Sequence, residues 1–183
     1  MINRRKFLAC LSGLLGMSLH ATAGITDKFS ISSIPMSAHE TAMRKAIEVA
    51  KLNPAYPFGA VITHAASGRI VAIGVNTSSA NPMFHGEIVC MNNYIKSLGN
   101  ANWSDHILYT TGEPCPMCMS ALTWAGVMGV VYGSSIETIS RSGIEQINIS
   151  AQTIAKAADF KQPELLGGIL EDFCDELFSK RQL

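Results

Sequence analysis

A histidine, a glutamate and two cysteines stand at spacings that suit a catalytic metal centre. The chain contains His85-Gly86-Glu87 and, about a helix and a strand later, Pro114-Cys115-Pro116-Met117-Cys118. The imidazole and the two thiolates supply three zinc ligands, and a catalytic zinc keeps its fourth tetrahedral position open. Glu87 is the one acid beside that position, so it is interpreted as a proton carrier and not as a ligand.

Zinc would make hydroxide available near neutral pH, because it lowers the pKa of a bound water from about 15.7 to about 7. Glu87 is then expected to pass a proton from this water to a ring nitrogen and to a departing amino group. The pattern H-x-E followed by P-C-x-x-C is typical of zinc-dependent deaminases. For the cysteine pair alone, a structural metal site or a redox-active pair is an alternative. A structural site would need a fourth protein ligand, and the chain has no second C-x-x-C pair.

The two prolines beside the cysteines predict the start of a helix. Proline in a first helical turn loses no internal hydrogen bond. Cys115 and Cys118, three residues apart, then share one side of that turn. The positive end of the helix favours the ionised thiolates that a metal requires.

Several short segments together match one known family. They are Phe58-Gly59-Ala60-Val61-Ile62, Asn76, His85-Gly86-Glu87, Leu108-Tyr109-Thr110-Thr111, Glu113-Pro114-Cys115-Pro116-Met117-Cys118 and Val130-Val131-Tyr132-Gly133. This set resembles the cytidine deaminase-like superfamily, in the branch that contains guanine deaminases, fungal-type cytosine deaminases and bacterial tRNA adenosine deaminases. The tail from Gly167 to Cys174 resembles the closing helix of tRNA and nucleoside deaminases, so the resemblance covers roughly three quarters of the chain.

The resemblance assigns roles to individual residues. It implies that His85, Cys115 and Cys118 bind Zn²⁺ and that Glu87 carries the proton. It places Asn76 at the position of an asparagine that hydrogen-bonds the base. A turn-forming role for this residue is the alternative, because asparagine tolerates turn backbone. The backbone amides of Gly86 and Cys115 are expected near the metal, where they would orient the substrate.

Departures from the family pattern concern the substrate more than the chemistry. Gly86 replaces the alanine that is usual in purine and tRNA relatives and resembles the glycine of fungal-type cytosine deaminases. Phe84, beside the metal ligand, is a candidate for stacking on a base, with helix-entry packing as the alternative. Bacterial guanine deaminases use an acid shortly after the Val-Tyr-Gly strand. Glu137 is the substitute here if the loop is shifted by one residue.

The amino terminus predicts export. Residues 1–23 have a basic start with Arg4-Arg5-Lys6, a short apolar core over residues 8–19 and a small-residue cleavage site at Ala21-Thr22-Ala23. The paired arginines resemble a twin-arginine signal, with a general secretory signal as the alternative. The predicted organisation is a signal peptide (1–23), a flexible arm (24–35) and a zinc-dependent deaminase domain (36–183). The mature protein is expected in the bacterial periplasm, with no membrane segment.

The charge of the chain limits the kinds of partner it can bind, and its cysteines indicate buried thiols. Removing Arg4, Arg5 and Lys6 leaves 11 basic residues against 14 acidic ones. A surface that binds tRNA should carry clustered lysine and arginine, so no nucleic-acid partner is expected. Cys90 and Cys174 lie on predicted helices with apolar neighbours and are interpreted as buried thiols in preference to a disulfide.

The hydrophobic pattern predicts an α/β protein, since strands and helices alternate along the chain. Strands are predicted at 59–63, 70–75, 107–111 and 129–133, with a short strand or turn at 144–148; helices are predicted at 37–52, 86–97, 115–125, 151–158 and 170–180. The resemblance implies a three-layer α/β/α cytidine deaminase-like sandwich with a central mixed five-stranded sheet.

The sequence therefore predicts a zinc hydrolase that removes an exocyclic amino group from a free nucleobase or nucleoside and releases ammonia. A purine of guanine type is favoured, and a cytosine or cytidine substrate is the alternative. A catalytically idle zinc-stabilised nucleotide-binding module and a tRNA adenosine deaminase are alternatives from other classes. The resemblance alone implies a homodimer, and Trp124 is expected in the core or at a subunit interface.

Overall fold

The computed structural model describes residues 29–182, and a five-stranded mixed sheet forms its centre. The strand order is β2-β1-β3-β4-β5. β1 pairs antiparallel with β2 and β3, whereas β3, β4 and β5 run parallel. The strands are β1 (Gly59–His64), β2 (Ile70–Val75), β3 (His106–Gly112), β4 (Gly129–Ser134) and β5 (Glu164–Leu166).

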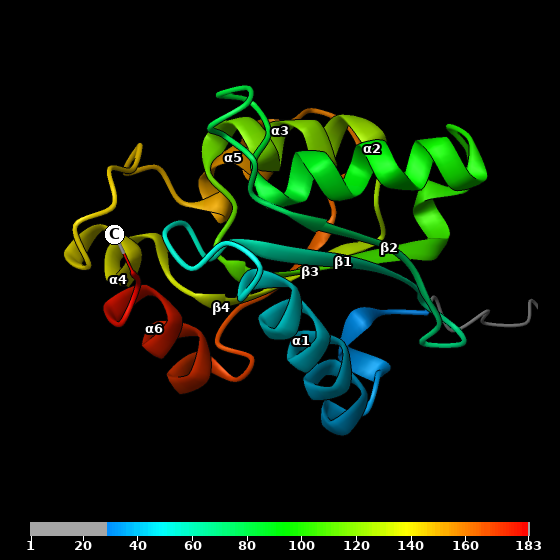
Figure 1. The fold of residues 1–183 in the computed structure, drawn as a ribbon. Helices are drawn as coiled ribbons and strands as arrows, with labels where there is room; N and C mark the ends of the chain where they lie inside the picture. The colour runs from blue at the N-terminus through cyan, green and yellow to red at the C-terminus, as the bar shows by residue number, and fades with distance from the viewer. Residues whose placement is uncertain (1–28, 183) are drawn as a thin grey trace, which may run out of the picture.

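Helices cover both faces of the sheet, which gives three layers (Figure 1). One face carries α2 (Gly86–Leu98), α3 (Pro116–Ala125) and α5 (Ala151–Ala157), and the other carries α1 (Met36–Ala50), α4 (Ile136–Arg141) and α6 (Glu171–Ser179). Two short 3-10 helices, η1 (Ile31–Ser33) and η2 (Trp103–Asp105), complete the described elements. The predicted α/β/α sandwich is confirmed.

The alternation of side chains along the strands builds one hydrophobic core on each face, because successive residues of a strand point to opposite sides. In β1, Ala60 and Ile62 pack with α2, α3 and α5, whereas Val61 packs with α1 and α6. Cys90 belongs to the first core and Cys174 to the second. The sheet therefore separates the two thiols, and both are free and buried.

Gly74 lets α2 lie directly on β2. A Cβ atom at this position would be 2.3 Å from the backbone nitrogen of Cys90 and 2.5 Å from the backbone oxygen of Gly86. Such distances are too short for any side chain, so only glycine permits this approach. The first turn of α2 is thereby held against the end of β2, next to the carboxyl end of β3.

Two predictions on the elements differ from the structure. The fifth strand is Glu164–Leu166, and residues 144–148 form no strand. Three residues at a sheet edge are too short to show an alternating pattern. The sequence predicts a flexible arm over residues 24–35, but Ile31 in this segment packs against the domain. It is 3% exposed, and its backbone nitrogen donates to Glu164 Oε2 at 3.0 Å. The predicted signal peptide lies outside the described residues and stays a prediction.

No helix among residues 29–182 combines the length and the apolar character needed to cross a bilayer.

Candidate active site

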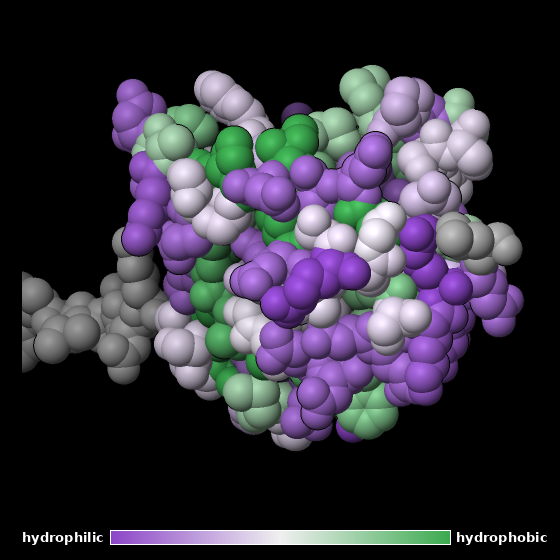
Figure 2. Space-filling model, turned by 90° about the vertical axis from the view of Figure 1, so that its left-hand side faces the viewer, coloured by the Kyte–Doolittle hydropathy of each residue, from purple (hydrophilic) through white to green (hydrophobic). Residues whose placement is uncertain are grey.

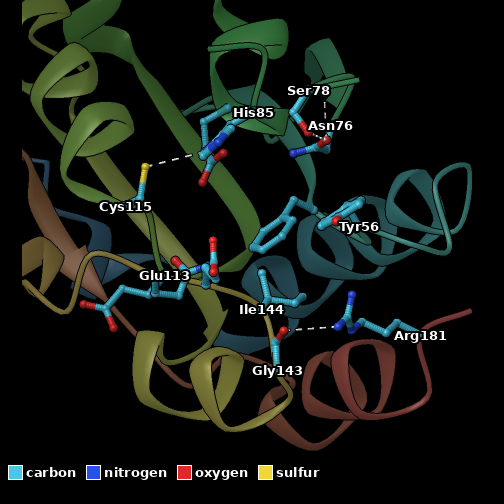
Figure 3. A pocket seen from close by; sticks show the side chains of 13 residues that line it. Tyr56, Asn76, Ser78, His85, Glu113, Cys115, Gly143, Ile144 and Arg181 are labelled. Atoms are coloured by element: carbon cyan, nitrogen blue, oxygen red, sulfur yellow. Dashed lines mark hydrogen bonds between the residues drawn. The ribbon is translucent and has the colours of Figure 1, made fainter. Parts of the chain in front are cut away.

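The three predicted metal ligands come together at the beginnings of two helices. His85 directly precedes α2, Cys115 directly precedes α3, and Cys118 lies in the first turn of α3. Their ligand atoms all lie within 4.8 Å of one another. Pro116 occupies the first turn of α3, as the sequence predicted. Figure 3 shows His85 and Cys115 facing each other at one end of the pocket.

The spacing of these atoms fits a tetrahedral zinc site. Bonds of about 2.3 Å to sulfur and about 2.1 Å to nitrogen place the two ligand atoms about 3.6 Å apart. His85 Nδ1 and Cys115 Sγ are 3.5 Å apart. Two soft thiolates and one imidazole form a donor set that binds zinc in preference to magnesium or calcium. The three residues are therefore suited to hold zinc with one coordination position free.

The interaction between the Cys115 and Cys118 thiols favours the ionised form of one of them. Hydrogen bonding from Cys118, together with His85, lowers the pKa of Cys115 to about 4 against the effect of burial. The same hydrogen bond, followed by burial, raises the pKa of Cys118 well above its ordinary value. The bond to Cys115 also raises the pKa of His85. The helix dipoles of α2 and α3 point their positive ends at this group, which favours negative charge there.

Glu87 lies in the first turn of α2 and is 2% exposed. Burial raises its pKa to about 6, and the negative charge of Cys115 adds to this shift. Thr110, on β3, donates through Oγ1 to Glu87 Oε1 at 3.4 Å. A carboxyl group with a raised pKa can both accept and release a proton near neutral pH, which suits a general acid and base.

A cavity of about 440 Å³ opens beside these residues, and His85, Cys115 and Glu87 are part of its wall. Asn76, 4% exposed and directly after β2, lines the same cavity. The surface at this end of the sheet is mostly hydrophilic, with smaller apolar areas between the polar ones (Figure 2). The structure thus brings Asn76 together with the metal ligands and the predicted proton carrier.

Two predicted substrate contacts, Glu137 and Phe84, lie outside this cavity, whereas the backbone contact predicted for Gly86 stays a prediction. Glu137 does not line the cavity: its side chain is 79% exposed and pairs with Arg141 at 2.9 Å. Phe84 is half-buried outside the cavity wall, where its backbone bonds Asn81 and Thr77, so helix-entry packing describes it better than stacking on a base. Gly86 is buried at the start of α2, with a Cβ position only 2.5 Å from the backbone oxygen of Phe58.

The cavity contains an acid that the sequence did not single out. Glu145, eight residues beyond Glu137, lies in its wall together with Ile144 and Gln146. These residues follow α4, which is only six residues long and turns the chain back toward the cavity. Counting residues from the Val-Tyr-Gly strand could not reveal this return.

Two segments far apart in the sequence contribute further to the wall. Tyr56 precedes β1, and Arg181 follows α6 (Figure 3). The Arg181 guanidinium donates to the backbone oxygen of Gly143 at 3.2 Å and lies 5.9 Å from the centre of the Tyr56 ring. A terminal arginine carries no local motif, so the sequence offered no signal for this role.

Two further residues hold the cavity wall in place. Phe58 stacks on the imidazole of His85, with their planes 15° apart. The carboxylate of Glu113 accepts from the backbone nitrogen of Ile136 at 3.0 Å and from that of Ala151 at 2.8 Å. These two amides begin α4 and α5, so one buried carboxylate fixes both ends of the segment that carries Glu145.

Comparison with known proteins agrees with this site. The model of the cytidine and deoxycytidylate deaminase zinc-binding region matches residues 36–134, and the chain belongs to this family. It is therefore a deaminase of the cytidine deaminase-like superfamily with a zinc centre, for which the His-Cys-Cys group is suitably placed.

Relatives named for different substrates share similar sequence identity with this chain. Guanine deaminase of Bacillus subtilis is 36% identical over 113 residues, which span 58% of this chain and 71% of that protein. The tRNA-specific adenosine deaminase of Rickettsia bellii is 30% identical over 135 residues, which span 71% and 90%. The structure of a guanine deaminase from Nitrosomonas europaea shares the fold, with a TM-score of 0.67, 21% identity and coverage of 84% and 96%.

Replacement of Cys118 by serine should remove the metal. The purified protein is expected to contain about one zinc per chain, and the variant less than about a tenth of that, because a neutral hydroxyl is a far weaker zinc ligand than a thiolate. Elemental analysis after gel filtration measures this. Cys174→Ala is the matched control, since that thiol lies on the other side of the sheet. Equal zinc in wild type and Cys118→Ser would contradict the assignment.

Proposed function

We propose that this protein is a zinc-dependent hydrolase that removes an exocyclic amino group from a nucleobase or nucleoside and releases ammonia, with a guanine-type purine as the favoured substrate. One observation carries the proposal. Glu87 is a buried acid with a raised pKa, and it lines the same cavity as His85 and Cys115. A site that only bound a nucleotide would have no use for such a proton carrier beside a metal with a free position.

The residues of the chain divide the chemistry between them. Zinc, when bound, supplies Lewis-acid activation of water. Glu87 takes one proton from the attacking water and gives it to the ring nitrogen. It then passes a second proton, from the hydroxyl added to the ring carbon, to the amino group, which leaves as ammonia. Thr110 donates to one carboxylate oxygen of Glu87 and so helps to hold this side chain in the cavity wall. Asn76 holds the ring so that the carbon bearing the amino group faces the metal.

The polar wall of the cavity supports a guanine-type ring. An ionised carboxylate only accepts hydrogen bonds, whereas the amino group of an amide donates them. Glu145 and Asn76 therefore complement a ring that offers both N–H donors and acceptors, as guanine and cytosine both do. The identity to a guanine deaminase, 36% against 30% for the tRNA enzyme, favours guanine. Cytosine or cytidine is the alternative substrate.

A tRNA substrate is the second candidate, supported by the tRNA-specific relatives. The charge of the cavity wall argues against it, since Glu145 lies in that wall and Arg181 is the one lysine or arginine among the described lining residues. Proteins that bind nucleic acid normally neutralise many phosphates.

Ammonia release from a panel of substrates tests the proposal. Zinc-loaded protein is expected to release ammonia from guanine or guanosine at least about tenfold faster than from cytosine, cytidine or adenosine, because a site built around a specific polar edge rejects mismatched rings. A coupled ammonia assay with product identification by chromatography measures this. Absence of turnover on every base and nucleoside, together with inosine formation in an anticodon-loop RNA, would favour the tRNA candidate instead.

Glu87→Gln should keep zinc bound and lose turnover. The amide keeps the shape of the carboxyl group but cannot accept the proton, so kcat is expected to fall by about 10²- to 10⁴-fold. Zinc content and kcat are measured on the same preparation. Glu137→Gln, an exposed position outside the cavity, is the matched control and should retain wild-type activity. A Glu87→Gln variant with more than about a tenth of wild-type kcat is incompatible with the proton-carrier role.

We also propose that the protein forms a homodimer. Trp124 is 78% exposed at the end of α3, and Phe160 packs against it with ring centres 4.8 Å apart. Trp124 is therefore not a core residue, which leaves the subunit interface as the predicted alternative. Large exposed aromatic side chains commonly mark protein contacts. Sedimentation velocity should show a dimer for the wild type and for Leu52→Lys, and a monomer for Trp124→Lys; a monomeric wild type at all concentrations would exclude this proposal.

A further inference from the structure

The backbone of Asn76 is fixed on both sides. Its N–H group donates to the backbone oxygen of Phe58 at 2.9 Å, and its carbonyl oxygen accepts from Asn53 Nδ2 at 2.9 Å. With both backbone groups paired and the residue 4% exposed, the side chain has one remaining freedom, the orientation of its terminal amide.

Ser78 binds one end of that amide. Asn76 Oδ1 accepts from the backbone N–H of Ser78 at 3.0 Å and from its hydroxyl at 2.8 Å. A side-chain oxygen that bonds the backbone two residues ahead forms a turn, so Asn76 fulfils the turn-forming alternative as well. Among the described residues no acceptor pairs with Asn76 Nδ2. Figure 3 shows the amide nitrogen turned away from Ser78.

We propose that Ser78 is a positioning residue that locks the Asn76 amide with its NH₂ group toward the substrate, so that the cavity selects rings with a hydrogen-bond acceptor at that place. This inference rests on the proposed deaminase function and specifies the polarity of its substrate contact.

The chemistry of the two donors makes the lock directional. A backbone N–H can only donate, so a reversed Asn76 amide would place Nδ2 against the Ser78 N–H, donor against donor. The hydroxyl of Ser78 adds a second donor to the same oxygen. Leaving a buried polar group unpaired costs more than a single hydrogen bond gains, so the locked orientation prevails in the free protein. The substrate then meets an amide that is already aligned.

The test compares Ser78→Thr with Ser78→Val, two variants of nearly equal shape that differ in the hydroxyl. Ser78→Val should raise KM by about 3- to 10-fold, the effect of one hydrogen bond, with kcat changed less than about twofold. Ser78→Thr should restore the wild-type KM. Ser67→Ala, which removes a serine hydroxyl that accepts from the backbone N–H of Arg69, is the control outside the cavity. Equal KM values for the valine and threonine variants would overturn the proposal.

Substrate analogues test whether the contact is to an acceptor. The 3-deaza and 7-deaza analogues of guanine each replace one ring acceptor by a C–H group. The wild type should bind one of them more weakly than guanine, and this difference should shrink in Ser78→Val, as expected for two groups that act on one interaction. Asn76→Asp replaces the donor by a second acceptor. This variant should lose affinity for guanine and should bind neither analogue more tightly than guanine.

An NMR measurement on the zinc-loaded protein without substrate separates this inference from the proposed function. The side-chain NH₂ signals of Asn76, assigned by their loss in Asn76→Asp, should be sharp in wild type and Ser78→Thr and broadened or shifted in Ser78→Val. Unchanged signals in the valine variant would exclude a lock by the Ser78 hydroxyl even if the enzyme deaminates guanine. Changed signals with no turnover on any substrate would leave the lock in place and reject the deaminase function.

Discussion

The whole site depends on one constraint, that three ligand atoms from two distant segments meet within 4.8 Å. His85 and Cys115 are 30 residues apart, and each stands directly before a helix. The helices bring these residues together because α2 lies on β2 and α3 follows β3, at the same end of the sheet. Gly74 is essential to this approach, since any side chain there would collide with the backbone of α2. The positive helix ends then favour the charge that the thiolates carry.

The opposite wall of the cavity depends on the buried side chain of Glu113. Glu113 immediately precedes the metal-binding turn, and its carboxylate holds the first amides of α4 and α5. The segment between those helices carries Glu145 into the cavity, while Arg181 joins it to the region of Tyr56. One short stretch of sequence, residues 113–118, thus supplies the two cysteine ligands and the anchor of the wall that faces them.

Local patterns predicted much of this arrangement. The metal ligands, Glu87 and the four longer strands could be located because each depends on residues close in sequence: a ligand pair in one helical turn, or alternation within one strand. Glu137 lies outside the cavity because the direction of the chain after β4 depends on the length of α4 and on the distant Glu113, which no local pattern shows. The fifth strand was missed because three residues pair only where β4 offers an edge.

The sequence by itself determined the chemistry of the centre: a His-Cys-Cys donor set, a neighbouring acid and the helix starts that carry them. Only the tertiary structure decided what else surrounds that centre, namely that Glu145 lines the cavity, that Phe84 and Glu137 do not, and that Ser78 and Arg181 take part in its wall. The physical reason is that ligand types follow from side-chain chemistry at short spacing. The cavity wall results from packing among segments whose relative placement no local pattern encodes.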